Sequence, residues 1–114
     1  MVERIQAAYK TVSADLLAAS NATGFWPGEL SSSPLSTATA VSALVSCELE
    51  MQRKDCLKEE WSEKIQLLIF SGLHYLAKQQ NEDGGWGDTD RSRSNIATTL
   101  LVRSAFQMAG APAH

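Results

Sequence analysis

Two stretches of this chain carry the same pattern of residues, and this internal repeat is the feature that most constrains the fold. Each stretch closes an apolar segment with Asn, Gly and Trp at one mutual spacing, and the two copies lie about sixty residues apart. The matched pairs are Leu16 and Leu76, Asn21 and Asn81, Gly24 and Gly84, Trp26 and Trp86 and, after one inserted residue, Leu35 and Ile96, Thr37 and Thr98, and Val41 and Val102. This agreement predicts two copies of one helix–loop–helix unit.

Length and charge predict one small domain that binds no nucleic acid. The 114 residues are enough for one hydrophobic core, and we expect a single domain 1–114 with repeat one at about 1–50 and repeat two at about 57–110. The net charge of -3 is mild, and the basic residues are scattered among acidic ones. Without a basic stripe, nucleic acid is not an expected partner.

Neither a membrane span nor a secretion signal is visible. The apolar run 67–70 is far too short to cross a bilayer, and the charged pair Glu3 and Arg4 stands where a signal peptide would be apolar. We therefore expect a cytoplasmic protein, and in that compartment Cys47 and Cys56 are expected as reduced thiols.

Apolar residues in the first half recur every three or four positions, which predicts two helices. The first runs to about Ala19, before Gly24 and Pro27. The second begins with Ser33 as its cap and Pro34 in its first turn, where the missing N–H is tolerated. The first stripe is Val2, Ile5, Tyr9, Val12 and Leu16, and the expected buried stripe of the second is Leu35, Ala38, Val41, Val45 and Leu49.

The second half predicts two more helices after a charged connection at 50–60. Gly72 is expected to be a close-packing point within the third helix, and Ser94 or Ser92 to cap the fourth. The third helix follows Leu57, Trp61, Ile65, Leu68, Gly72 and Tyr75 up to residues 79–81. The fourth has Ile96, Leu100 and Ala105 on one side and Leu101, Val102 and Phe106 toward another, which predicts burial on more than one face. No segment alternates with period two, so the fold class is all-α, with about four helices.

The loop after the third helix has a structural interpretation. Gly84 and Gly85 permit a positive-φ turn that ends the helix, and Trp86 then covers the helix end with apolar surface. Gln80 carries a donor and an acceptor, so it is expected to bond helix-terminal carbonyls. Together these residues predict a structural link that ties consecutive helix pairs.

Chemical interpretations of the same region are weaker. The acidic residues Glu82, Asp83, Asp88 and Asp90 are expected to be solvated, paired with arginine or placed at the positive end of the fourth helix. His74 has no nucleophile beside it in the sequence. We therefore assign no catalytic residue, no cofactor and no metal ligand.

One family shares these motifs. The stretch 72–86 resembles the QW repeat of the squalene-hopene cyclase and oxidosqualene cyclase family, which ends in Gln-x-x-x-Gly-x-Trp. The matching residues are Gly72, Tyr75, Leu76, Gln80, Gly84 and Trp86, whereas Ser71 replaces the basic residue of the pattern. The stretch 24–30 resembles the first repeat of bacterial triterpene cyclases. In that degenerate copy Gly24 and Trp26 match, but Ser20 stands at the Gln position.

The resemblance implies part of an α/α toroid of repeated helix pairs. Complete family members are isomerases of terpenoid biosynthesis that cyclise squalene or a similar polyprene, some of them at a membrane. They start the reaction by protonating an alkene with an Asp-x-Asp-Asp motif. This chain resembles only the N-terminal portion, and Asp88-Thr89-Asp90-Arg91 ends in Arg, so no acid is transferred to it.

Two hypotheses remain from the sequence. The chain is a fragment or truncated member of a triterpene cyclase, inactive alone, whose partner is the remainder of a toroid. Alternatively, it is a helical-repeat module that associates with copies of itself and binds a protein partner or an apolar ligand. A third toroid family, the protein prenyltransferase β subunits, carries a metal-binding Asp, Cys and His pattern that this sequence lacks.

Overall fold

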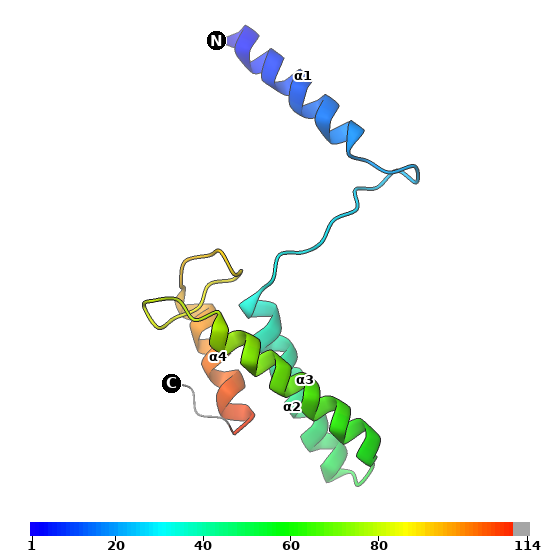
Figure 1. Ribbon diagram of the computed structural model, residues 1–114, viewed down its shortest axis with the longest axis vertical. Helices are drawn as coiled ribbons and strands as arrows, with labels where there is room; N and C mark the ends of the chain where they lie inside the picture. Colours follow the sequence, from blue (N-terminus) through cyan, green and yellow to red (C-terminus); the bar gives the residue numbers. More distant parts are fainter. Residues whose placement is uncertain (111–114) are drawn as a thin grey trace. The chain divides into compact units, whose positions relative to one another are not determined.

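The computed structural model describes residues 1–110, and within them the protein is all-helical, as the sequence predicts. Its four helices are α1 (Val2–Ala18), α2 (Pro34–Arg53), α3 (Glu59–Lys78) and α4 (Ile96–Met108) (Figure 1). They divide into two compact units, one from Met1 to Leu30 and one from Ser31 onward. None of the described helices combines the length and the apolar character that crossing a bilayer requires.

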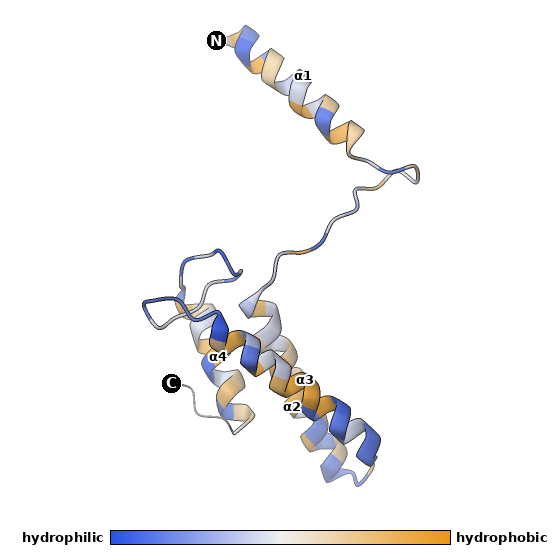
Figure 2. Ribbon diagram, in the orientation of Figure 1, coloured by the Kyte–Doolittle hydropathy of each residue, from blue (hydrophilic) through white to orange (hydrophobic). Residues whose placement is uncertain are grey.

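The first unit consists of α1 and the loop that follows it. None of the residues of α1 is buried. Its apolar stripe lies along the helix as the periodicity predicts (Figure 2), and each of its five side chains is more than half exposed: Val2, Ile5, Tyr9, Val12 and Leu16. An amphipathic helix draws most of its stability from packing of its apolar face, and the first unit by itself does not cover the apolar face of α1.

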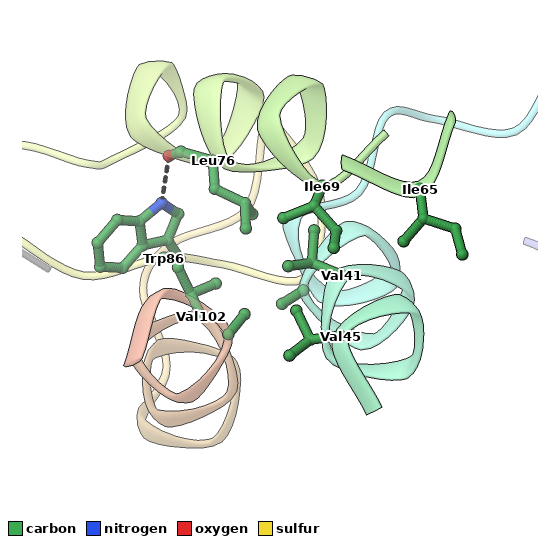
Figure 3. Packing of buried hydrophobic residues seen from close by; sticks show 9 residues of the cluster. Val41, Val45, Ile65, Ile69, Leu76, Trp86 and Val102 are labelled. Atoms are coloured by element: carbon green, nitrogen blue, oxygen red, sulfur yellow. Dashed lines mark hydrogen bonds between the residues drawn. The ribbon is translucent and has the colours of Figure 1, made fainter. Parts of the chain in front are cut away.

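The second unit is a three-helix core with α2 at its centre. Helix α2 packs along both α3 and α4, whereas α3 and α4 touch only over a short stretch. Side chains from all three helices and from the loop before α4 meet in one cluster (Figure 3). The cluster is Ala38, Val41, Val45, Ile65, Ile69, Leu76, Trp86, Val102 and Ala105.

Gly72 lies where α3 closely approaches α2. A Cβ atom at this position would lie 2.5 Å from Cγ2 of Val41, which is closer than van der Waals contact allows. The prediction of a close-packing glycine inside the third helix is therefore confirmed.

The helix starts match the sequence at one place and differ at another. Ser33 caps α2, as predicted, because its Oγ accepts a hydrogen bond from the Ser36 N–H at 3.0 Å. The prediction of a serine cap for α4 was wrong. Asn95 caps this helix through Oδ1, which accepts from the Thr98 N–H at 2.9 Å, while the Ser94 hydroxyl is engaged with Asp83 in the preceding loop.

In α2 the expected stripe is buried at Ala38, Val41 and Val45 but not at its end, and in α3 burial follows a rotated face. Leu49 is exposed, and Glu48 is buried in its place. Its carboxylate accepts hydrogen bonds from Ser62 at 3.3 Å and Gln66 at 2.5 Å, so α3 supplies the partners that a buried charge requires. In α3 the side chains of Leu68 and Trp61, part of the expected stripe, are more than half exposed; the buried ones are Ile65, Ile69 and Leu76.

Helix α4 buries one face only. Thr98, Val102 and Ala105 are almost fully covered, whereas Ile96 is 79 % exposed and Leu100 57 % exposed. The expectation of burial on several faces was wrong because α2, α3 and the Trp86 side chain cover a single side of this helix within the described residues.

Candidate functional site

The chain reverses direction after α3 through a short hydrogen-bonded loop. The Asn81 N–H donates to the Gly85 carbonyl at 2.9 Å, and the Gly84 N–H donates to the Asn81 carbonyl at 2.9 Å. Gly84 has φ +81°, a conformation that glycine adopts without strain. The helix itself already ends at Lys78, so the glycines shape the loop and do not end the helix, which corrects the sequence expectation.

Trp86 joins this loop back to the helix it follows. Its indole N–H donates to the Leu76 carbonyl in the last turn of α3 at 2.7 Å, and the side chain is only 3 % exposed. Figure 3 shows the ring lying between the end of α3 and Val102 of α4. The Leu76 carbonyl also accepts from the Gln79 N–H at 3.1 Å, so the indole adds a second hydrogen bond to this helix end and fills the core at the same time. We call this arrangement of loop and indole the clasp.

The first copy forms the same clasp. The Asn21 N–H donates to the Phe25 carbonyl at 2.8 Å, and the Gly24 N–H donates to the Asn21 carbonyl at 3.0 Å. Gly24 has φ +85°, and the Trp26 indole donates to the Leu16 carbonyl at 2.5 Å. Each bond has its counterpart in the second copy at matching positions, so the internal repeat is a repeat of structure as well as of sequence.

The two clasps differ in what holds them to the next helix. In the second copy the Asn95 N–H donates to the Trp86 carbonyl at 3.0 Å, and the Trp86 N–H donates to the Thr99 hydroxyl at 3.0 Å. Gly85 permits this approach, because a Cβ there would lie 2.8 Å from Ser94 Cβ and 2.9 Å from Thr99 Oγ1. We call these contacts between loop and α4 the tether.

The aligned residues of the first copy are unable to form the tether. Pro34 stands at the position of Asn95 and has no N–H, and Ala38 stands at the position of Thr99 and has no hydroxyl. Phe25 and Pro27 replace Gly85 and Gly87, the glycines of the closed loop. The tether was not predicted from the sequence, although the differences between these aligned positions indicate that only the second copy is able to form it.

Two carboxylates of the loop reinforce the tether. Asp83 accepts from the Ser94 hydroxyl at 2.6 Å and from the Gly85 N–H at 3.0 Å. The Ser94 hydroxyl is the main cause that lowers the pKa of Asp83.

Asp88 accepts hydrogen bonds from residues at the start of α4. It accepts from the Thr98 hydroxyl at 2.5 Å and from the Asn95 side-chain amide at 2.7 Å, and the Thr98 bond is the main cause that lowers its pKa. Among the described residues, the ion pairs do not include Asp83 or Asp88. Carboxylates with lowered pKa values stay ionised at neutral pH, so they hold the loop and are poorly suited to act as general acids.

The other residues of the predicted motif lie around the clasp. Gln80 lies beyond the helix end and donates from Nε2 to the Gly84 carbonyl at 2.8 Å, which closes the loop. At the matching position, Ser20 instead donates to the Leu17 carbonyl of its own helix at 2.8 Å. The Tyr75 hydroxyl is buried, and this burial raises its pKa above the ordinary value.

The remaining polar groups offer no assembled chemical centre. His74 stacks on Phe70, with ring centroids 6.3 Å apart, and Cys47 and Cys56 are exposed free thiols. No group of three or more potential metal ligands occurs among residues 1–110. A polar surface hollow of about 550 Å³ lies at the tip of the second loop, where Asp83, Asp90 and two arginines face solvent.

An apolar groove lies between α2 and α3. It has a volume of about 350 Å³. Its lining consists of Ser36, Thr37, Ala40, Val41, Leu44, Leu68 and Gly72. Because the described part of the chain leaves this apolar surface uncovered, the groove is a candidate binding surface.

Comparisons of the chain with protein-family models, with curated proteins and with solved structures found no match.

Proposed function

We propose that this chain is an N-terminal part, or a truncated member, of a triterpene cyclase similar to squalene-hopene cyclase, and that it supplies scaffold helices of an α/α toroid. The observation that carries the proposal is the repeated clasp, in which Trp26 and Trp86 each bond the helix carbonyl ten residues upstream. Both clasps contain residues of the Gly-x-Trp motif on which the resemblance rests.

The proposed role follows from what a clasp does physically. Each clasp fixes a helix end to the loop that leads into the next helix, so helix pairs can stack with a constant geometry. In the second copy, the Trp86 ring adds buried apolar surface between consecutive helices. A stack of such pairs gives a rigid wall, and in the complete enzyme this wall would surround a polyprene substrate such as squalene.

The chain alone is proposed to be inactive. Protonation of an alkene needs a carboxylic acid that keeps its proton in a site shielded from water. The carboxylates of the second loop have the opposite properties, because Asp83 and Asp88 are on the surface and their pKa values are lowered. The 114 residues contain no Asp-x-Asp-Asp sequence.

Two measurements test this proposal. The coding region beyond His114 is read first, and we expect an open frame with further Gly-x-Trp repeats and an Asp-x-Asp-Asp motif. A stop codon directly after His114 would contradict the fragment form of the proposal. The purified chain is then incubated with squalene, and the extract is analysed by mass spectrometry. We expect no cyclised product above a protein-free control, and product formation would refute inactivity.

One observation favours a second candidate function, a helical-repeat module that associates with itself or binds an apolar partner. The stripe of α1 and the groove between α2 and α3 both leave apolar surface open in the described residues. Exposed apolar patches of this kind mark interaction surfaces. Retention of the purified chain on an immobilised copy of itself would support this candidate, and free passage at micromolar concentration would count against it.

A further inference from the structure

Glu48 of α2 is an acidic side chain buried inside the second unit, where only 6 % of it is exposed. Both of its carboxylate oxygens accept hydrogen bonds. Oε1 accepts from the Ser62 hydroxyl at 3.3 Å, and Oε2 accepts from Nε2 of Gln66 at 2.5 Å. Two donors on one carboxyl group suit its ionised form, which only accepts hydrogen bonds.

The charge of Glu48 has no cationic partner within the described part of the chain. The ion pairs found there involve the exposed carboxylates of Glu50 and Glu60 instead. Hydrogen bonds reduce the cost of burying a carboxylate, but they leave its charge uncompensated, and a buried charge without a counter-ion is costly. A cation placed beside Glu48 would therefore stabilise the second unit.

A small hollow lies beside this carboxylate, with a volume of about 170 Å³. Side chains of α2, α3 and the end of α4 line it, and four of them form apolar walls: Val45, Leu49, Ile69 and Met108. An apolar cavity of about 150 Å³ holds a benzene molecule, so this hollow has room for about six non-hydrogen atoms.

The polar groups that line the hollow match an ammonium ion. A carboxylate has about four acceptor positions, and the two hydrogen bonds to Glu48 use two of them. Gln66 donates to Glu48 through Nε2, which leaves its Oε1 as an acceptor, and Gln52 carries a second amide oxygen at the same hollow. An ammonium group has three donors and one positive charge, and these acceptors suit both.

We propose that this hollow binds a short alkylammonium ion, with the ammonium group at Glu48 and the alkyl chain against the apolar walls. The walls favour an organic cation over a metal ion. Calcium and magnesium bind through several oxygen ligands, whereas this hollow supplies a single carboxylate and mostly apolar surface. The site lies within the second unit, and the proposal depends on neither of the functions proposed above.

The test titrates the full chain with n-butylammonium chloride and follows the backbone amide signals of Leu49 and Ala109 by NMR, at constant ionic strength. We expect saturable shifts with a Kd of about 1 mM. The control ligands are n-butanol, which lacks the charge, and ammonium chloride, which lacks the alkyl chain. Each should bind about tenfold more weakly or less. Shifts that do not saturate, or an equal affinity for either control ligand, would overturn the proposal.

Two pairs of variants locate the site. Glu48→Gln removes the buried charge and should raise the Kd about tenfold or more, whereas Glu50→Gln removes an exposed charge from the same helix and should leave the Kd unchanged. Leu49→Lys places a competing ammonium group at the hollow and should also raise the Kd about tenfold, whereas Leu67→Lys changes an exposed leucine that does not line the hollow.

The lysine variants keep the test independent of whether Glu48→Gln folds. Leu49 and Leu67 are both more than half exposed, so neither substitution removes a side chain from the core. Far-UV circular dichroism checks that each variant keeps its helices. A Leu49→Lys protein that binds n-butylammonium as tightly as the wild type would overturn the proposal, and so would a folded Glu48→Gln protein with an unchanged Kd.

Discussion

The two clasps form the same hydrogen bonds, yet one lies in a core and the other is largely exposed. Trp26 and Trp86 both donate to the carbonyl ten residues upstream, but their exposed fractions are 50 % and 3 %. The clasp is therefore a local structure, specified by Asn, Gly and Trp at fixed spacing. Burial of the ring depends on a second set of residues, which hold the loop against the next helix.

This difference shows that one set of residues specifies the local fold of a repeat and another set specifies its contacts with the next helix. The residues of the clasp are shared between the copies, whereas the residues of the tether are present only in the second. A repeat can thus keep its local fold while it loses its attachment to a neighbour.

The largest expected effect separates the two tryptophans. Trp86→Ala should destabilise the second unit by about 3–5 kcal/mol, because a buried aromatic ring and its hydrogen bond to the Leu76 carbonyl are both lost. Trp26→Ala should lower the stability of this unit by no more than about 0.5 kcal/mol. Urea unfolding of dilute protein, followed by far-UV circular dichroism, measures both values. Equal losses would show that the two clasps are equivalent.

A smaller effect is expected from exchanging the residues before each tryptophan. Gly85→Ala should destabilise the second unit by about 1–3 kcal/mol, because its Cβ would lie within 2.9 Å of Ser94 and Thr99. The reciprocal change Phe25→Gly meets no such contact and should alter the free energy of unfolding by less than about 1 kcal/mol. A Gly85→Ala protein as stable as the wild type would mean that the tether is loose in solution.

Acidification should act on the second clasp. The pKa values of Asp83 and Asp88 are lowered in the folded state, so the unfolded state binds protons more readily as the pH falls. Their contribution is fully present above the unfolded value of about 3.9 and is lost as the pH falls through the lower folded values.

The matched comparison for acidification is the double variant Asp83→Asn with Asp88→Asn. Its urea unfolding midpoint should fall less than that of the wild type as the pH is lowered below 5, because two of the carboxylates that take up protons on unfolding are absent. Glu50 also has a lowered pKa, caused mainly by Arg53, but it is present in both proteins and cancels. Identical pH profiles for the two proteins would show that Asp83 and Asp88 do not stabilise the tether.

The smallest expected effect concerns the degenerate position of the first copy. Ser20→Gln would introduce the side chain that closes the second loop, where Gln80 donates to the Gly84 carbonyl. We expect the loop 21–25 to gain about 0.5 kcal/mol, the net value of one exposed hydrogen bond. Amide exchange of Gly24, measured by NMR, should slow by about two-fold. Unchanged or faster exchange would show that a glutamine at position 20 does not close the first loop as Gln80 closes the second.

The sequence predicted the positions of the helices better than it predicted which of their faces are buried. Periodicity located four helices, and Ser33 with Pro34 located the start of α2, because these signals are local. The choice of buried face failed where it depended on neighbours. Glu48 is buried because α3 supplies Ser62 and Gln66 as partners, which periodicity does not show.

In the second clasp, too, the local residues were predicted and their contacts with distant residues were not. The repeat identified Gly84 and Trp86, but it did not show that Asn95 would cap α4 in place of Ser94. That outcome depends on Asp83, which engages the Ser94 hydroxyl from eleven residues away. The tether was nevertheless readable from alignment of the two copies, since Pro34 and Ala38 lack the groups of Asn95 and Thr99. Differences between repeats therefore carry information that shared motifs do not.

The most direct test of the account is hydrogen exchange of the three tryptophan indole N–H groups, assigned by single Trp→Phe variants and followed by NMR. If both loops form the clasp, the indole of Trp86 should exchange slowest and that of Trp26 should also be protected. The exposed Trp61 should exchange fastest. A Trp26 indole that exchanges as fast as that of Trp61 would contradict the central claim that the two loops share one hydrogen-bonded structure.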